Sequence, residues 1–261
     1  GWENRQNIIK STGSTPRDIS HNTVAIDYIF YNVWANYPID WFLWIGGNGD
    51  GNVDVFSNTV TSNGAGLLNF MAVGDQCKVY DNTYDGTLKR YNFWGDSYMY
   101  GGDGSIFRIN GHGSEIYNNI LLNQDAAWAF YFGGDNTSNT KIYNNTIESN
   151  IDQISWSVYD SYYGNNIQYC SIDNGFRIYG SDYEINNNSD IYNNTLTGVI
   201  GLGLNINNTH NFKFYNNHIT GLNQGSTIFN TTSFDIHHNL FQLLSSGDGV
   251  DINNSSGSLH N

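Results

Sequence analysis

A short segment, Lys141 to Ile147 with the sequence KIYNNTI, recurs along the chain and constrains its fold more than any other feature. Each copy places an Asn after an apolar and often aromatic stretch. From Asn32 to Asn239 the mean step is about 26 residues, in the range of solenoid repeats. The repeated residues are Asn32, Asn58, Asn82, Asn119, Asn145, Asn166, Asn194, Asn217 and Asn239.

Each copy alternates apolar with polar residues and is rich in Ile, Val, Tyr and Phe, which indicates a strand with one buried face. An Asn amide carries donors and acceptors, so it can bond to the same residue in the strands above and below. Such a ladder requires strands stacked parallel and in register, about 4.8 Å apart. We therefore expect an all-β, single-domain, right-handed parallel β-helix (a solenoid) of about nine to ten rungs, with Asn ladders.

The repeat predicts residues 23–261 as the parallel β-helix and residues 1–22 as an irregular N-terminal segment, either a cap or a docking arm. The longer step from Asn82 to Asn119 predicts an inserted loop near 89–104. Trp94, Tyr98 and Tyr100 in this loop are candidates for contact with a glycan or another subunit. The alternative is a loop that folds back over its own rung.

Composition narrows the possible partners. The net charge is −14 and no basic cluster is present, which disfavours nucleic acid and anionic membranes. No apolar run approaches the length of a transmembrane helix, so no membrane insertion is expected. An acidic chain rich in Asn and Tyr favours an extracellular or cell-surface location, and no cofactor is predicted.

The two cysteines, Cys77 and Cys170, fall at different corners of the expected coil. They are also about three rungs apart, or roughly 14 Å along the axis, which is too far for an internal disulfide. Two interpretations stay open: two buried thiols, or a disulfide between subunits.

Polar residues alternate in the segment GNGDGNVD, at Asn48, Asp50, Asn52 and Asp54, as at the start of a calcium loop. Val53 stands where such a loop needs Gly, and no Glu follows at the twelfth place. No metal site is therefore predicted beyond this weak calcium candidate. The simpler interpretation is a turn with a solvated carboxylate.

The repeats KIYNNTIESN, DIYNNTLTGV and FKFYNNHITG resemble the parallel β-helix repeats of pectate-lyase-like proteins. These include polysaccharide lyases, polygalacturonases and phage tailspikes, and the resemblance is greatest to the surface and sheath-type solenoids of archaea and bacteria. It implies the fold. Because that scaffold hosts enzymes, adhesins and coats alike, it leaves function open.

Polygalacturonases carry four segments that NGDG at 48–51, GDQC at 74–77, GHGS at 111–114 and FRIY at 176–179 match in order here. This resemblance implies Asp75, His112 and Arg177 as the catalytic residues if the chain is an enzyme. However, Gln76 and Tyr179 replace an expected Asp and Lys, and inverting hydrolysis needs paired carboxylates. His112 is more simply a turn residue, so we predict no catalytic residue and lean against an enzyme.

A lyase would need a basic residue beside metal-binding acids. The basic residues considered for that role look scattered and form no convincing set: Arg108, Lys141, Arg177 and Lys213.

The final residues Leu259, His260 and Asn261 repeat the opening of a ladder strand. A bare last rung indicates either a fragment or an end that meets the next subunit, since open solenoid ends expose unpaired backbone. Head-to-tail contact makes rings or filaments. The leading hypothesis is a structural coat, sheath or fibre subunit that forms a homo-oligomer or polymer through its chain ends. The alternatives are a polysaccharide-degrading enzyme and a non-catalytic glycan-binding adhesin, either with a polysaccharide partner.

Overall fold

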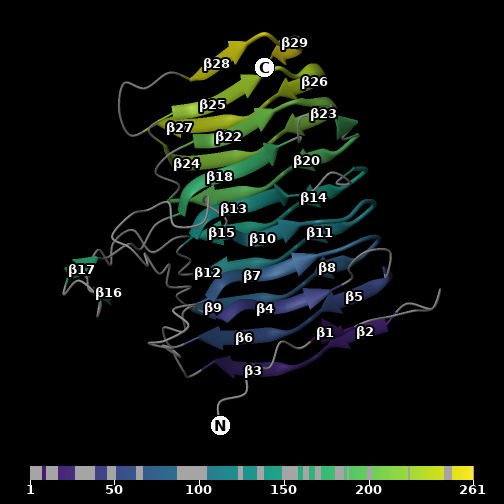
Figure 1. Ribbon diagram of the computed structural model, residues 1–261, viewed down its shortest axis with the longest axis vertical. Helices are drawn as coiled ribbons and strands as arrows, with labels where there is room; N and C mark the ends of the chain where they lie inside the picture. The colour runs from purple at the N-terminus through teal and green to yellow at the C-terminus, as the bar shows by residue number, and fades with distance from the viewer. Residues whose placement is uncertain are drawn as a thin grey trace.

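The computed structural model describes residues 8–9, 17–26, 39–45, 51–62, 67–86, 105–122, 126–133, 138–148, 158–160, 165–167, 172–179, 185–186, 188–198, 202–222, 224–243 and 249–260. Its strands form three parallel sheets, A, B and C, which the chain visits in turn. Figure 1 shows the strands stacked from the N-terminal end at the bottom to the C-terminal end at the top. The described residues contain no helix. The predicted all-β parallel solenoid is confirmed.

Sheet A has nine strands among the described residues. In stacking order they are β1 (Ile8–Ile9), β4 (Ile39–Ile45), β7 (Leu67–Val73), β10 (Ser105–Ile109), β13 (Ala126–Gly133), β18 (Ile172–Tyr179), β22 (Leu202–Asn207), β25 (Gln224–Phe229) and β28 (Val250–Asn253). Parallel in-register pairing places equivalent side chains directly over one another. The buried rings of Phe107, Phe130 and Phe176 therefore stack, with centroids 5.3 and 4.8 Å apart.

In the part of the chain that the structure describes, sheet B has ten strands. Its main path is β2 (Arg17–Ser20), β5 (Val53–Phe56), β8 (Lys78–Tyr80), β11 (Glu115–Tyr117), β14 (Lys141–Tyr143), β20 (Asp190–Tyr192), β23 (Thr209–Tyr215), β26 (Thr232–His237) and β29 (Ser256–His260). The short β19 (Ile185–Asn186) pairs with β23 beside this path. The middle residue of each short strand faces the core, as with the fully buried Ile116, Ile142 and Ile191.

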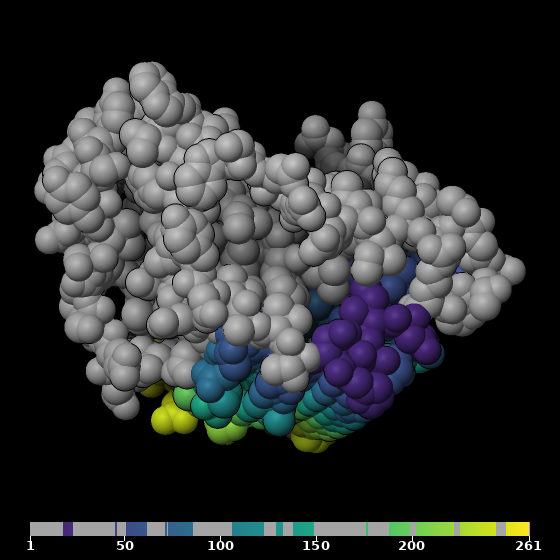
Figure 2. All heavy atoms as spheres, turned by 90° about the horizontal axis from the view of Figure 1, so that it is seen from below, coloured from purple at the N-terminus to yellow at the C-terminus, as the bar shows by residue number. Residues whose placement is uncertain are grey.

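The described residues contribute eight strands to sheet C: β3 (Thr23–Ile26), β6 (Thr59–Ser62), β9 (Thr83–Gly86), β12 (Ile120–Leu122), β15 (Thr146–Glu148), β21 (Thr195–Thr197), β24 (His218–Leu222) and β27 (Leu240–Leu243). Its inward column includes Leu121, Ile147 and Leu196, all buried. Seen from the N-terminal end in Figure 2, the coloured residues of successive turns lie behind one another, from purple to yellow.

The corner between sheets B and C takes only two residues. The first has a left-handed backbone, as at Asn144 (φ 55°) and Asn193 (φ 56°), a conformation that Asn tolerates better than most residues. The second is the ladder Asn. The ladder residues are Asn22, Asn58, Asn82, Asn119, Asn145, Asn194, Asn217 and Asn239.

Each ladder side chain bonds in two directions along the stack. The Asn119 backbone N–H and Nδ2 donate to Oδ1 of Asn145 at 3.1 and 2.9 Å. The same Nδ2 donates to the carbonyl oxygens of Val79, on the preceding turn, and of Tyr117. Because Asn119 and Asn145 are each only 1% exposed, these bonds satisfy polar groups that water cannot reach.

Two parts of the sequence prediction need correction. The coil begins before residue 23: β2 and Asn22 already belong to sheet B and the ladder, while Asn32 lies outside the described residues. Asn166 is not a rung, because Asn145 bonds directly to Asn194. Asn166 lies on β17 (Asn165–Ile167), which pairs antiparallel with β16 (Val158–Asp160) outside the three coil sheets.

Candidate functional site

A column of aromatic side chains runs along the outer face of sheet B. Neighbouring ring centroids are between 4.8 and 5.3 Å apart, and the rings lie within 10° of parallel. The members are Phe56, Tyr80, Tyr117, Tyr143, Tyr192, Tyr215 and His237, each two positions before a ladder Asn, and then His260. Since each face covers the next ring, only ring edges and hydroxyl groups remain for solvent. The column therefore lacks the open aromatic faces on which sugars stack.

Charged side chains form a second column beside the rings. The parallel register aligns Asp18, Asp54, Lys78, Glu115, Lys141, Asp190, Lys213 and Asp235. From Asp54 onward acids and lysines alternate. An in-register stack would otherwise place like charges opposite one another, which is destabilising, so the alternation stabilises the coil.

The basic residues that looked scattered in the sequence lie in ordered columns of the coil. Lys141 and Lys213 flank Asp190 in the charge column. Arg108 and Arg177 share a column on sheet A, separated by Tyr131, and the Arg108 guanidinium lies 5.2 Å from the Tyr131 ring centroid.

The environment of the columns shifts the titration of several groups. Burial, reinforced by the neighbouring Tyr80 and Glu115, raises the pKa of Tyr117 to about 12. Burial also raises the pKa of Tyr143, whose hydroxyl donates to Oε2 of Glu115 at 3.3 Å. The pKa of Asp54 is raised by burial, although Lys78 partly opposes this. These shifts follow from stacking alone and require no ligand.

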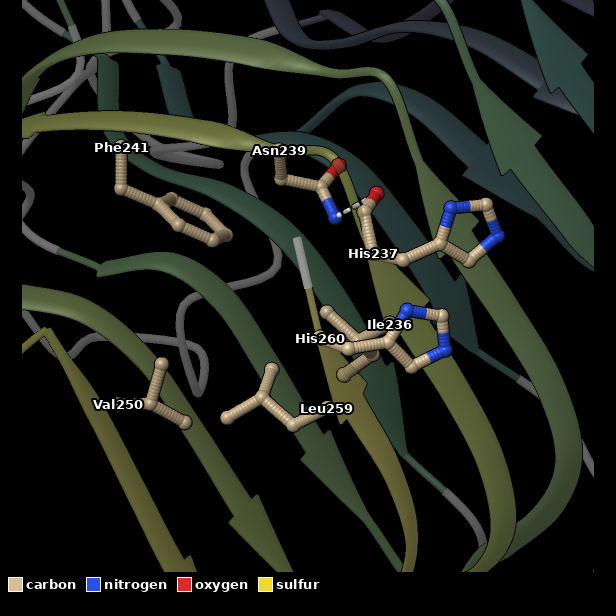
Figure 3. A pocket seen from close by; sticks show the side chains of 7 residues that line it. All are labelled: Ile236, His237, Asn239, Phe241, Val250, Leu259 and His260. Carbon is tan, nitrogen blue, oxygen red and sulfur yellow. Dashed lines mark hydrogen bonds between the residues drawn. The ribbon is translucent and has the colours of Figure 1, made fainter.

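The C-terminal end of the stack opens into a hollow of about 350 Å³. Figure 3 shows Phe241, Val250 and Leu259 around this hollow, with the parallel rings of His237 and His260 at its edge. The remaining lining residues are Ile236 and Asn239. We call this hollow the C-terminal mouth. It exposes side-chain positions that the preceding turns bury: Ile219, beneath Phe241 in sheet C, is 0% exposed.

Imidazole and carboxylate groups form the rim of the mouth. Nε2 of His260 lies 3.4 Å from Oδ1 of Asp235, and Nε2 of His237 lies 3.9 Å from its Oδ2. Nδ1 of His237 is 2.8 Å from Nδ1 of His238. No group of three or more His, Cys, Asp or Glu in the described part of the chain is arranged to hold a metal ion.

Two of the three fallback catalytic residues lie together. Nδ1 of His112 is 3.1 Å from Oδ1 of Asp75, and the same oxygen accepts the His112 backbone N–H at 2.9 Å. This pair sits at the corner between sheets A and B. Arg177 does not join it, because β18 is separated from β10 by β13 in sheet A. These contacts include no second carboxylate that could act as the general acid or base.

Close packing explains why Gly is present on both sides of Asp75 at the corner between sheets A and B. A Cβ at Gly111 would lie 2.2 Å from the Asp75 backbone nitrogen, and one at Gly51 would lie 2.2 Å from the Asp75 carbonyl oxygen. The Asp75 carboxylate thus binds His112 in the corresponding corner of the next turn and fixes the backbone there. This contact agrees with a turn function for both residues.

Other candidates are only partly described. Asn48 and Asp50 of the calcium motif lie outside the described residues, as do Trp94, Tyr98, Tyr100 and Cys170. Asn52 adopts φ 65° and donates its backbone N–H to the Asp75 carbonyl, as a corner residue does. Cys77 is fully buried, and burial raises its pKa to about 11, so its thiol suits a core position.

No helix in the described residues is long and apolar enough to cross a lipid bilayer. No model of a known protein family matches the chain, and no curated protein matches it. Function therefore has to be inferred from the residues of the molecule itself.

Sequence reasoning missed both outer columns and Asn22. The signal was present in the segments KIYNN, DIYNN and FKFYNN: a charged residue lies four positions before the ladder Asn, and a Tyr two positions before it. Alternation in a strand puts these two residues on the same outward face. The pattern HNTVAI at residues 21–26 likewise matches SNTVTS at 57–62.

Proposed function

We propose that the chain is a structural component of an extracellular coat, sheath or fibre. The observation that supports this most is the presence of three continuous columns, of amides, rings and alternating charges, along the same coil. In the first two columns hydrogen bonds and ring stacking link one turn to the next, and in the third the register sets acids opposite lysines. Such a rod suits a load-bearing subunit, because a turn within the stack cannot separate without breaking amide hydrogen bonds and ring contacts.

Assembly through chain ends is part of this proposal. At the C-terminal end of the stack Leu259 is 48% exposed, whereas Ile236 and Phe214, which take the same position in earlier turns, are buried. Exposed apolar groups beside open strand edges favour association with further strands. We infer that copies of the chain associate with one another, which gives a homo-oligomer or polymer.

We also infer a right-handed coil of nine to ten turns of the kind found in pectate-lyase-like proteins. Connections between parallel strands of one sheet are right-handed in about 98% of cases. The Asn ladder and the stacked interior columns support the same comparison.

Electron microscopy of the purified chain tests the structural function. We expect ordered fibres, sheets or tubes that persist on heating. Uniform short rods at all protein concentrations would contradict it. Antibody labelling of intact source cells tests the proposed location, since a surface component is labelled without permeabilisation.

A polysaccharide-degrading enzyme is the second candidate, and the contact between His112 and Asp75 favours it. Release of reducing sugars from a panel of polysaccharides is the test. The informative substitutions are Asp75→Asn, His112→Ala and Arg177→Ala. If an activity is found and none of the three lowers it, the assignment of these residues is wrong. A glycan-binding adhesin has less support, because the rings on sheet B cover one another.

A further inference from the structure

The charge column on the outer face of sheet B alternates in sign from turn to turn. Between β8 and β26 its members are Lys78, Glu115, Lys141, Asp190, Lys213 and Asp235. Neighbouring members are about 4.8 Å apart along the axis, the spacing of adjacent strands. Figure 1 shows these strands stacked one above another along one side of the coil. This side therefore presents an ordered row of opposite charges.

The column alternates in height as well as in charge. Its lysines are exposed, as at Lys141, because each ammonium group lies at the end of a long, flexible side chain. Glu115 and Asp190 are half-buried, and each lies between two lysines. A second column of the same kind, shifted by one turn, would place its lysines over these carboxylates.

The position of the rings limits how two such faces can meet. Within each strand the ring column lies two residues after the charge column, as with Tyr143 after Lys141. If a second copy faces the first with its coil in the same direction, its rings lie opposite the charges. If its coil runs in the opposite direction, charges meet charges and rings meet rings. This second arrangement has a two-fold axis, so both copies use the same surface and the contact closes as a dimer.

One register of the reversed column brings only opposite charges together between Lys78 and Asp235. It places the two-fold axis between β14 and β20, so that Lys141 of one copy lies opposite Asp190 of the other. The same axis gives every other member a partner of opposite sign. These further pairs are Glu115 with Lys213 and Lys78 with Asp235. A shift of one turn in either direction would place lysines opposite lysines.

We propose that the outer face of sheet B is an interface between two copies of the chain, which pack side by side with their coils in opposite directions. The charges identify the partner, because a surface of a single sign would meet a like charge at every second turn. Exposed ion pairs are weak one by one and are screened by salt, so the dimer is weak and depends on ionic strength. This contact goes beyond the proposed function and is separate from association through the chain ends.

Carbodiimide cross-linking at low ionic strength is the first test, since this reagent joins Lys only to a carboxylate in direct contact. We expect a cross-linked dimer with links between Lys78 and Asp235 and between Lys213 and Glu115. Within one chain these residues lie five and three turns apart, or about 24 and 14 Å, so both links report contacts between copies. Addition of 1 M salt should remove the dimer.

A charge exchange separates the interface from the stability of the coil. Lys141→Glu and Asp190→Lys each place like charges at the centre of the dimer, so each variant alone should associate about tenfold more weakly or worse. In an equal mixture of the two variants the central charges are again opposite, and dimers should return. Arg108→Glu is the matched control, because it makes the same change of charge on sheet A and should leave association unchanged. Sedimentation velocity measures association, and thermal melting checks that each variant is folded.

Two results would overturn the interface. One is a chain that stays monomeric at low ionic strength, and the other is equal association of Lys141→Glu alone and of the mixture. If a variant does not fold, the cross-links decide. Ordered polymers without the link between Lys78 and Asp235 refute this contact but leave the structural function. Cross-linked dimers that form no polymers support the contact and contradict the coat.

Discussion

Asn145 and Asn194 are 49 residues apart in the chain and direct neighbours in the ladder. Nδ2 of Asn145 donates to Oδ1 of Asn194 at 3.0 Å, and its backbone N–H donates to the same oxygen at 3.1 Å. The intervening segment therefore forms a single turn of the coil, which contains β15 and β18 and carries the hairpin of β16 and β17 outside the three sheets. A single amide oxygen serves two buried donors, and continuity of the stack depends on it.

Replacing Asn194 with Ala should therefore destabilise the coil. The substitution removes the acceptor of the Asn145 backbone N–H and the side-chain donor to the Ile142 carbonyl oxygen, at about 1–3 kcal/mol for each buried group left unsatisfied. Urea unfolding measures the loss. The exposed Asn253→Ala is the control and should change the free energy of unfolding by less than about 0.5 kcal/mol. Equal effects of the two substitutions would show that the ladder contributes little.

Tyr143→Ala should also destabilise the coil, because the Tyr143 ring stacks on Tyr117 at 4.8 Å and on Tyr192 at 5.0 Å. With about 0.5–1.5 kcal/mol for each aromatic pair, we expect a loss of about 1–3 kcal/mol in thermal or urea unfolding. Tyr143→Phe keeps both stacks and removes only the hydroxyl contact with Glu115, so most of the stability should return. A Phe variant as unstable as the Ala variant would contradict the stacking argument.

Charge reversal tests the alternating column. Lys141 pairs in register with Glu115 on one side and Asp190 on the other, so Lys141→Glu places three acids in succession. We expect a loss of up to about 1 kcal/mol at low ionic strength, smaller at 1 M salt because exposed charges are screened. Lys141→Gln should show a weaker effect with less salt dependence. A loss independent of salt would indicate a packing effect instead.

High pH should weaken the coil through the tyrosine column. The pKa of Tyr117 is raised to about 12 from its ordinary value of 10, mainly by burial. A raised folded pKa means that the stabilisation is complete below pH 10 and is lost as the pH rises toward 12. Ultraviolet absorbance of tyrosinate, together with unfolding free energies over this range, measures it. Tyr117→Phe should reduce the loss, whereas ionisation of all tyrosines near the ordinary value would contradict a buried column.

The candidate site was predictable only in part. The repeated Asn indicated a ladder, and the apolar residues next to it indicated the inward face of each strand. Where a segment matches the repeat less well, the sequence does not show which of its residues would take the ladder position. In YGNNIQ either Asn165 or Asn166 fits the repeat, and a shift of one residue turns every side chain to the opposite face. The mouth was not predictable in detail, since its lining comes from β26, β27, β28 and β29 together.

By itself the sequence determined the strand period, the parallel stacking and the buried polar ladder, because these depend on residue types repeated at a regular distance. Only the tertiary structure decided which copies are neighbours, that Asn22 begins the ladder and that Asn145 meets Asn194. It also decided that Asp75 meets His112. The reason is physical. A local pattern of residue types sets which way a side chain points, whereas the residue it contacts depends on which segments of the chain form consecutive turns of the coil.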